Sequence, residues 1–200
     1  MSTVAVYDVD TEAWYEQETT GKGPGQLTQG CTVVASSQDG SSHNIYWYGG
    51  FDGLNPASPD AYNDDVWVLS VPSFTWMKVK SGNISHGRAG HRCVKPYPDQ
   101  MIVIGGYTAM AGSSWKCLED GIIQIFNLSS AEWVTSYDPQ LWGEYLVPST
   151  VYETIGGSAT GGASQLQPSW RGFANSDLES IFATPYNSTK IRKWYPYARE

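Results

Sequence analysis

Carboxylates gather in one loop of the sequence, the stretch from Phe51 to Asp65. This loop contains Asp52, Asp60, Asp64 and Asp65. Clustered carboxylate oxygens on a loop are ligands that Ca²⁺ prefers. Their spacing matches no known calcium loop, however, and most acidic loops remain solvated. We therefore favour a solvated loop over a calcium site and predict no bound metal.

The residues used most often in catalysis and transition-metal binding are few. The chain has three histidines and three cysteines: His43, His86, His91, Cys31, Cys93 and Cys117. The cysteines have no metal-ligand spacing, and their odd number leaves at least one thiol unpaired within the chain. The simplest interpretation is three buried, inert thiols, and the sequence leaves their disulfide status open. Because no nucleophile elbow, phosphate-binding loop or zinc spacing is found, we predict neither enzymatic activity nor a cofactor.

Three asparagines begin Asn-X-Ser/Thr sequons and are candidate glycosylation sites: Asn83, Asn127 and Asn187. The sequence places the first between repeats, the second in a hairpin turn and the third in the C-terminal tail. All three are expected at the surface, as glycan attachment requires. The sequons favour a secreted parent protein.

The net charge argues against one class of partner. The chain has 20 acidic and 12 basic residues, a formal net charge of −8 at pH 7, which repels the phosphate backbone of nucleic acids. No apolar run approaches the ~20 residues that span a bilayer, and no signal peptide is visible. We predict no nucleic-acid partner and no membrane span within this chain.

An internal repeat organises these residues. Three segments align without a gap: Val4–Trp14, Val66–Trp76 and Ile123–Trp133. Each has four mostly apolar or aromatic residues, then a turn, then a tryptophan at the same offset, which predicts a β-hairpin. We expect Trp14, Trp76 and Trp133 to lie at equivalent positions on outer strands and to fill the wedge between neighbouring sheets.

A double glycine precedes two of these hairpins. Gly49 and Gly50 end the stretch from Asn44, and Gly105 and Gly106 end the stretch from Gln100. We expect each pair to lie where a strand ends, the chain bends and another backbone packs closely, because only glycine tolerates both. With one more strand before each pair, every full unit is a four-stranded antiparallel sheet.

The double glycines, the aromatic residue after each (Phe51 and Tyr107) and the spaced tryptophans resemble the kelch repeat, whose period is about 50 residues. The stretch 87–93 resembles the start of a kelch blade. From there to Asp138, the chain is similar to fungal kelch proteins with a galactose oxidase-like central domain.

The resemblance implies an all-β fold, a partial kelch β-propeller with a mostly irregular C-terminal tail. We expect two complete four-stranded antiparallel blades and the outer hairpin of a preceding blade. Residues 1–18 are assigned to the outer hairpin of the incomplete blade, 27–80 and 86–138 to the complete blades, and 143–200 to the tail.

In the tail, Gly156–Ser164 is expected to be a flexible linker, because it is rich in small residues. Val151–Thr154 could add one more strand. Ser176 could cap a short helix, with Glu179 placed for a capping box.

The resemblance also implies a non-catalytic interaction scaffold, a fragment of a fungal secreted or cell-surface protein. Two alternatives are a galactose oxidase-like copper oxidase and a cytosolic kelch adaptor. The oxidase would need paired histidines, two tyrosines and a cysteine cross-linked to one of them. We expect a structural role for His91 at the blade start and a turn at His43.

A ligand, protein or carbohydrate, is expected at two long loops, Phe51–Asp65 and Tyr107–Glu119. Long loops on one face of a rigid scaffold are where such folds place their binding residues.

Overall fold

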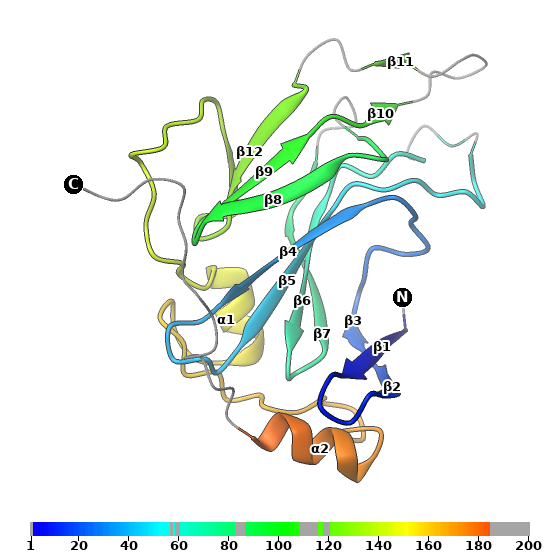
Figure 1. The fold of residues 1–200 in the computed structure, drawn as a ribbon, viewed down its shortest axis with the longest axis vertical. Coiled ribbons are helices and arrows are strands. Elements are labelled where there is room, and N and C mark those ends of the chain that lie inside the picture. Colours follow the sequence, from blue (N-terminus) through cyan, green and yellow to red (C-terminus); the bar gives the residue numbers. More distant parts are fainter. Residues whose placement is uncertain are drawn as a thin grey trace.

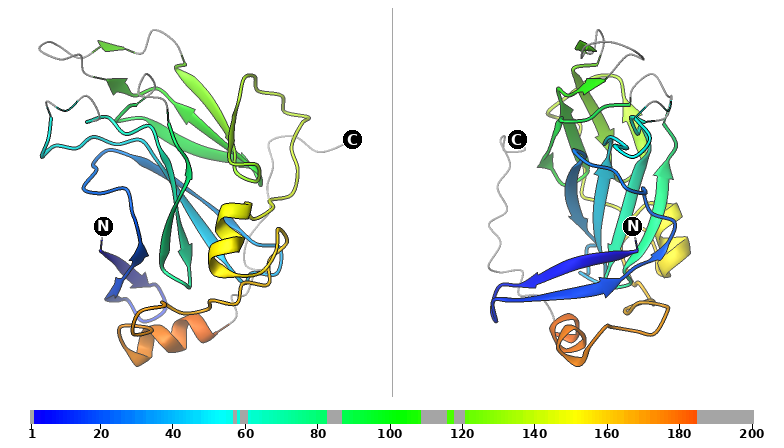
Figure 2. Two further views of the ribbon diagram at one scale, coloured as in Figure 1. Left: turned by 180° about the vertical axis from the view of Figure 1, so that it is seen from behind. Right: turned by 90° about the vertical axis from the view of Figure 1, so that its right-hand side faces the viewer.

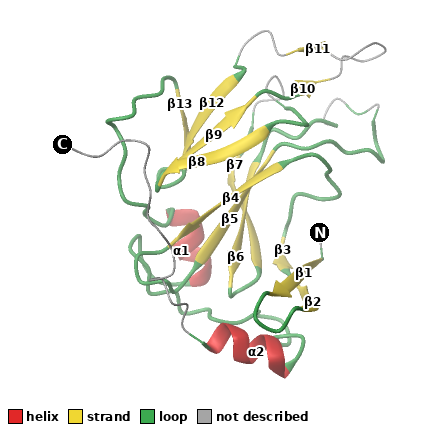
Figure 3. Ribbon diagram, in the orientation of Figure 1, coloured by secondary structure: helices red, strands yellow, loops and turns green. Residues whose placement is uncertain are grey.

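The computed structural model describes residues 2–56, 58, 61–82, 87–108, 116–117 and 121–184. Strands dominate this part of the chain, and two short helices follow them (Figure 3). No helix in these ranges is both long and apolar enough to cross a membrane.

The N-terminal hairpin is a separate two-stranded antiparallel sheet of β1 (Thr3–Asp8) and β2 (Ala13–Glu18). Trp14 is the second residue of β2 and pairs with Tyr7 across the hairpin. Its side chain is 70% exposed. The hairpin lies beside the outer edge of the next sheet (Figures 1 and 2), to which it is joined by β3 (Thr20–Gly21).

The next sheet, called here the first blade, has the strand order β3-β7-β6-β5-β4. Four of its strands are β4 (Cys31–Ser36), β5 (His43–Tyr48), β6 (Val66–Val71) and β7 (Thr75–Lys80). These four strands are antiparallel, as predicted. The fifth strand was not predicted: β3 pairs parallel with β7, because the connection from the hairpin runs along the outer edge of the sheet.

The second blade has the order β13-β12-β9-β8, four antiparallel strands. They are β8 (Arg92–Tyr97), β9 (Gln100–Ile104), β12 (Ile123–Asn127) and β13 (Glu132–Val134). A short ladder of β10 (Tyr107–Thr108) and β11 (Lys116–Cys117) extends from the loop between β9 and β12.

The two blades face each other, with the inner strands β4 and β8 side by side (Figure 1). Tyr46 and Tyr48 of β5 meet Phe126 and Trp133 of the second blade in one apolar core. The ring centroids of Tyr48 and Trp133 are 4.9 Å apart. We call this interface the seam.

The C-terminal segment also enters the seam. Helix α1 (Ser149–Ile155) buries Val151 and Ile155 in the same core. The strand considered possible for Val151–Thr154 is therefore not formed: one apolar face with i, i+4 spacing forms a helix here. Tyr145, just upstream, contacts the hydroxyl of Tyr46 at 2.9 Å.

The glycine-rich stretch after α1 is packed against the first blade and is not a free linker. The backbone N–H of Gly162 donates to Asp39 at 2.6 Å, and that of Ala163 to Ser41 at 3.1 Å. Partial desolvation raises the pKa of Asp39, but the hydrogen bonds from Ser41, Ser37 and Gly162 outweigh it and hold the pKa well below its usual range. The segment is therefore fixed by hydrogen bonds to the turn between β4 and β5.

Helix α2 (Ser176–Ala183) lies below the β6–β7 turn, where Phe173 and Phe182 contact Phe74 (Figure 1). Its N-cap is Asn175, whose side chain accepts from Asp177 and Leu178. The assignment of Ser176 as the cap was therefore wrong by one residue, because both residue types are good caps and Asn175 has the extended backbone.

Candidate ligand face and inter-blade seam

The double glycines occupy backbone that other residues avoid. All four have positive φ: +68° at Gly49, +107° at Gly50, +69° at Gly105 and +96° at Gly106. A Cβ on Gly49 would lie 2.2 Å from Cε1 of His91 and 2.8 Å from the carbonyl oxygen of Arg88. A Cβ on Gly105 would meet no atom within 4 Å. A Cβ on Gly50 would lie 3.1 Å from the carbonyl oxygen of Thr28, and one on Gly106 would lie 3.0 Å from that of Ala89. Of the four glycines, Gly49 is the one at which the added Cβ would meet the neighbouring blade.

Backbone hydrogen bonds cross the seam next to Gly49. The N–H of Gly50 donates to the carbonyl of Arg88 at 2.8 Å, and the N–H of Gly90 donates to the carbonyl of Gln29 at 2.9 Å. His91 Nε2 lies 3.1 Å from the carbonyl oxygen of Tyr48 and must be its donor, since a carbonyl only accepts. These bonds align the glycine-rich ends of the two blades.

Arg88 is fully buried at the start of the second blade. Its guanidinium donates to the carbonyls of Gly105 at 3.2 Å and Gly121 at 2.8 Å. The hydroxyl of Tyr48 donates to the buried Asp64 at 2.8 Å. Burial, with Asp64 alongside, raises the pKa of Tyr48 well above its usual value. Arg88 of the second blade and Asp64 of the first are therefore both engaged in hydrogen bonds that stabilise the buried part of the fold.

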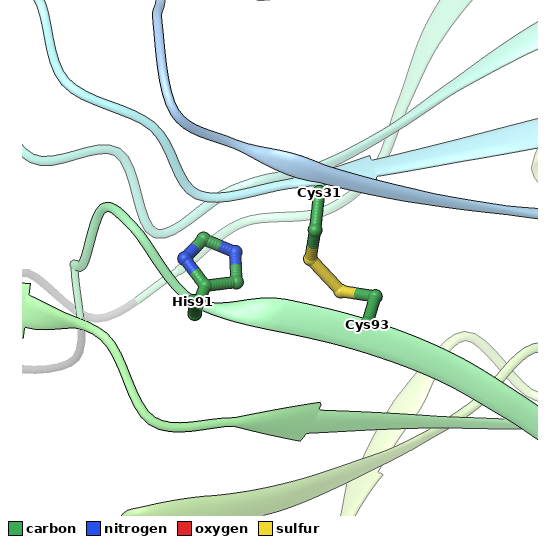
Figure 4. Close-up of side chains that lie close together, drawn as sticks. All are labelled: Cys31, His91 and Cys93. Carbon is green, nitrogen blue, oxygen red and sulfur yellow. A yellow bond between two sulfur atoms is a disulfide. The ribbon is translucent and has the colours of Figure 1, made fainter.

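A disulfide joins Cys31, the first residue of β4, to Cys93 of β8, with the Cα atoms 5.5 Å apart (Figure 4). Three inert thiols had been expected, so this interpretation was wrong. The pairing links residues 62 positions apart, which no local spacing reveals. Of Cys117, the structure describes only the backbone, in β11.

His91 lies beside this disulfide (Figure 4) and is 1% exposed. Burial lowers the pKa of His91 to about 4, so the ring is neutral at physiological pH. Ligand atoms of Cys31, Cys93 and His91 all lie within 4.8 Å of one another. Both sulfurs are engaged in the disulfide and Nε2 in the bond to Tyr48. The group could hold a metal only after reduction.

Aromatic side chains from both blades meet beyond the double glycines. Phe51 and Tyr62 flank the β5–β6 loop, with ring centroids 5.0 Å apart, and Tyr62 and Tyr107 of β10 are 6.1 Å apart. All three are half-buried. The hydroxyl of Tyr107 donates to the side chain of Gln29, which lies before β4. We call Phe51, Tyr62 and Tyr107 the aromatic row.

The aromatic row lies in the two loops in which a ligand was predicted. In the sequence, Phe51 and Tyr107 stood out because each follows a double glycine. Tyr62 and Gln29 were missed, because nothing in their local spacing marks them. Residues 57, 59–60, 109–115 and 118–119 of the two loops lie outside the described residues.

The acidic residues of the first loop are engaged separately. Asp52 accepts from the backbone of Leu54 at 2.9 Å, Asp64 accepts from Tyr48, and Asp65 pairs with Lys78 at 2.9 Å. Asp60 lies outside the described residues. Asp52 therefore stabilises a turn of the loop, and Asp64 and Asp65 bond to side chains of the blade.

The three repeat tryptophans differ in burial. Each is the second residue of its strand, Trp14 in β2, Trp76 in β7 and Trp133 in β13. Trp76 is 4% exposed and packs with Trp67 and Leu69, whereas Trp14 is largely exposed. Trp133 packs on Tyr48 across the seam. The wedge role is therefore visible for Trp133 and not for Trp14.

Asn127 is the one sequon asparagine among the described residues. Its side-chain oxygen accepts from the backbone of Ser129 and Ser130, and its Nδ2 lies 3.3 Å from Asp99. The nitrogen that would carry a glycan thus already contacts Asp99, in the turn between β8 and β9. Asn83 and Asn187 lie outside the described residues and stay predictions.

Of the histidines considered for copper, His43 is the first residue of β5 and not part of a turn, which corrects the prediction. Its Nδ1 lies 2.8 Å from the hydroxyl of Ser36. Burial lowers the pKa of His43. His86 lies outside the described residues.

Two sheets, each with four antiparallel strands and the first with the parallel β3 in addition, face each other around adjacent inner strands. This arrangement is an arc of β-propeller, and the predicted all-β fold is confirmed. No protein-family model matches the chain. A kelch repeat-containing protein of Arthroderma benhamiae is 34% identical over 190 residues, which cover 84% of this chain and 28% of the relative. The solved structure of YjhT is similar with a TM-score of 0.41 and 18% identity, over 72% of this chain and 53% of that one.

This chain is a kelch-repeat protein, as the double glycines and spaced tryptophans predicted. It spans less than a third of the length of the Arthroderma relative.

Proposed function

We propose that this kelch chain is a non-catalytic interaction scaffold of a secreted or cell-surface fungal protein and that it binds carbohydrate at the aromatic row. The observation that carries the proposal is the row itself. Phe51, Tyr62 and Tyr107 come from two blades, meet at one end of the arc and are half-buried.

The chemistry of the row favours carbohydrate as the ligand. Flat aromatic rings pack against the C–H faces of sugar rings and bury apolar area at little cost in conformational entropy. Two residues with side-chain amides are exposed nearby: Gln29, which contacts Tyr107, and Asn55, in the loop between Phe51 and Tyr62. Amides donate and accept at once, which suits hydroxyl groups. The excess of acidic residues also favours a neutral ligand over an anionic one.

The disulfide supports a secreted or cell-surface setting. Stable disulfides form in oxidising compartments and are rare in the cytosol. This argues against a cytosolic kelch adaptor. The identity with a protein of Arthroderma benhamiae and the sequons at Asn83 and Asn187 support a fungal glycoprotein.

The non-catalytic assignment rests on how the candidate copper ligands are used. His91 donates to the backbone, the hydroxyl of Tyr48 donates to Asp64, and Cys31 and Cys93 form a disulfide. Each of these side chains has a structural partner. A copper oxidase would need the same residue types free to converge on one ion.

Removing two rings of the row tests the proposal. We expect the Tyr62→Ala/Tyr107→Ala variant to bind soluble glucose or N-acetylglucosamine oligosaccharides about tenfold more weakly than wild type, because aromatic anchors carry most of the energy of such contacts. Isothermal titration calorimetry measures the affinity of both proteins for each oligosaccharide.

The matched control is Tyr137→Ala. Tyr137 is 42% exposed and lies beyond β13, away from the row, so its loss should leave binding unchanged. The proposal fails if no oligosaccharide binds wild type, or if the control loses as much affinity as the row variant.

A further inference from the structure

We propose that the Cys31–Cys93 disulfide is a clasp that holds the aromatic row in its binding geometry and that its reduction releases the row. The part that concerns ligand rests on the proposed function. The mechanical part rests on the seam alone. Figure 4 shows the disulfide between the starts of β4 and β8, the point at which the two blades come together.

The disulfide lies next to the bonds that align the two loop ends. Cys31 follows Gln29 by two residues, and Cys93 follows Gly90 by three. The N–H of Gly90 donates to the carbonyl of Gln29 at 2.9 Å across the seam. Gln29 then accepts from the hydroxyl of Tyr107. A short path of covalent and hydrogen bonds therefore leads from the disulfide through Gln29 to Tyr107 of the row.

Apart from the disulfide and the chain itself, non-covalent contacts join the two blades at the described part of this end of the seam. β4 and β8 belong to different sheets, so no strand ladder joins them. Hydrogen bonds from Gly50, Gly90 and His91 join the blades there. The hydroxyl of Tyr107 also donates to Gln29, and that of Tyr48 lies 3.3 Å from Gln124 of β12. Individual hydrogen bonds contribute little net stability, and a covalent link that removes chain freedom contributes more.

The backbone of Gln29 has a conformation that could change when the disulfide is reduced. Its φ is +59°, in the left-handed region that non-glycine residues avoid. A residue stays there only while its surroundings require it. When the clasp opens, we expect the backbone of Gln29 to leave this region, and its contacts with Gly90 and Tyr107 to be lost together.

The redox step is ordinary thiol–disulfide exchange. A dithiol reductant attacks one sulfur, the S–S bond breaks, and the dithiol closes to its own cyclic disulfide. Two electrons and two protons pass to Cys31 and Cys93, which become thiols. Both cysteines are half-buried, so a small dithiol can reach them.

Amide hydrogen exchange tests the clasp without any ligand. On adding dithiothreitol to the native protein, we expect exchange at Gly50 and Gly90 to accelerate about tenfold or more, because a restraint on local opening is lost. The amides of Gln38 and Val147 bond to the tail carbonyls of Thr160 and Ala159, far from the row, and should not change.

The Cys31→Ser/Cys93→Ser variant is the control for the effect of dithiothreitol. It should show fast exchange at Gly50 and Gly90 from the start and no further response to dithiothreitol. Cys117 is present in both proteins, so an effect of the reagent through Cys117 would appear in the variant as well. If the variant does not fold, reduction of the native wild type still gives the answer.

Three outcomes would overturn the clasp. These are unchanged exchange at Gly50 and Gly90, equal acceleration at all four amides, or slow exchange restored to the reduced protein by Zn²⁺, which would indicate a metal site in place of a disulfide clasp. Oligosaccharide affinity should fall with the same reduction. If exchange responds but oxidised wild type binds no oligosaccharide, the proposed function fails and the clasp stands as a lock on the seam.

Discussion

Replacing Trp76 by alanine should lower the free energy of unfolding by about 3–5 kcal/mol, the range for removing a large buried aromatic side chain. Trp76 is 4% exposed, and its ring lies against Gly23 and the side chains of Trp67 and Leu69. The remaining cavity could not collapse, because the ring is enclosed by the sheet on one side and the β3 connection on the other. Urea denaturation monitored by circular dichroism measures the change.

Two variants make this result specific. Trp14→Ala removes the same side chain from the same strand position, but Trp14 is 70% exposed, so the loss should stay within about 0.5 kcal/mol. Trp76→Phe should retain most of the stability, because the buried indole N–H has no hydrogen-bond partner among the described residues. Equal losses for Trp76→Ala and Trp14→Ala would contradict the packing described.

The second large effect is expected at Gly49. Gly49→Ala and Gly105→Ala both place a Cβ on backbone with φ near +68°, which costs about 1–2 kcal/mol in either case. Only at Gly49 does the new methyl group meet the imidazole of His91 and the carbonyl of Arg88. We expect Gly49→Ala to be more destabilising than Gly105→Ala by a further 1–3 kcal/mol or so, the usual cost of overpacking.

A double-mutant cycle with His91→Ala identifies the source of that difference. Because removing the imidazole relieves the shorter of the two clashes, the double variant should be more stable than the sum of the single changes implies. The comparison uses denaturation midpoints of the four proteins at one pH. Additive effects, or equal effects at Gly49 and Gly105, would show that the blades do not meet at His91.

The repeat was readable from the sequence because it rests on local chemistry. A hairpin turn needs particular residues at fixed offsets from Trp76 and Trp133, and a bend with positive φ needs glycine, as at Gly49. These requirements recur in each unit, so alignment of the chain with itself reveals them. The close backbone approach predicted at the double glycines is found at Gly49, Gly50 and Gly106 but not at Gly105, and at Gly49 the neighbouring blade causes it.

The seam could not be read in the same way, because its partners are far apart in the chain. Nothing near Cys31 points to Cys93, and nothing near Tyr46 points to Tyr145, which lies 99 residues away. Val151 lies in a short apolar segment that suits a strand or a helix equally. The helix is favoured because it packs both Val151 and Ile155 into the seam.

The aromatic row was likewise only partly predictable from the sequence. Phe51 and Tyr107 follow recognisable double glycines, so the two loops were predicted. Tyr62 completes the row through tertiary contacts, and Gln29 joins it from the segment before β4. A ligand site shared by two blades therefore exists only once the seam has formed.

Disulfide mapping of the native protein tests the central claim, that the two repeats are neighbouring blades which meet at β4 and β8. The protein is digested without reduction, with free thiols blocked, and the linked peptides are identified by mass spectrometry. The structure predicts a single linked pair containing Cys31 and Cys93, with Cys117 recovered as a blocked thiol. A bond from Cys117 to either of the others, or three blocked thiols in protein from an oxidising compartment, would contradict the seam.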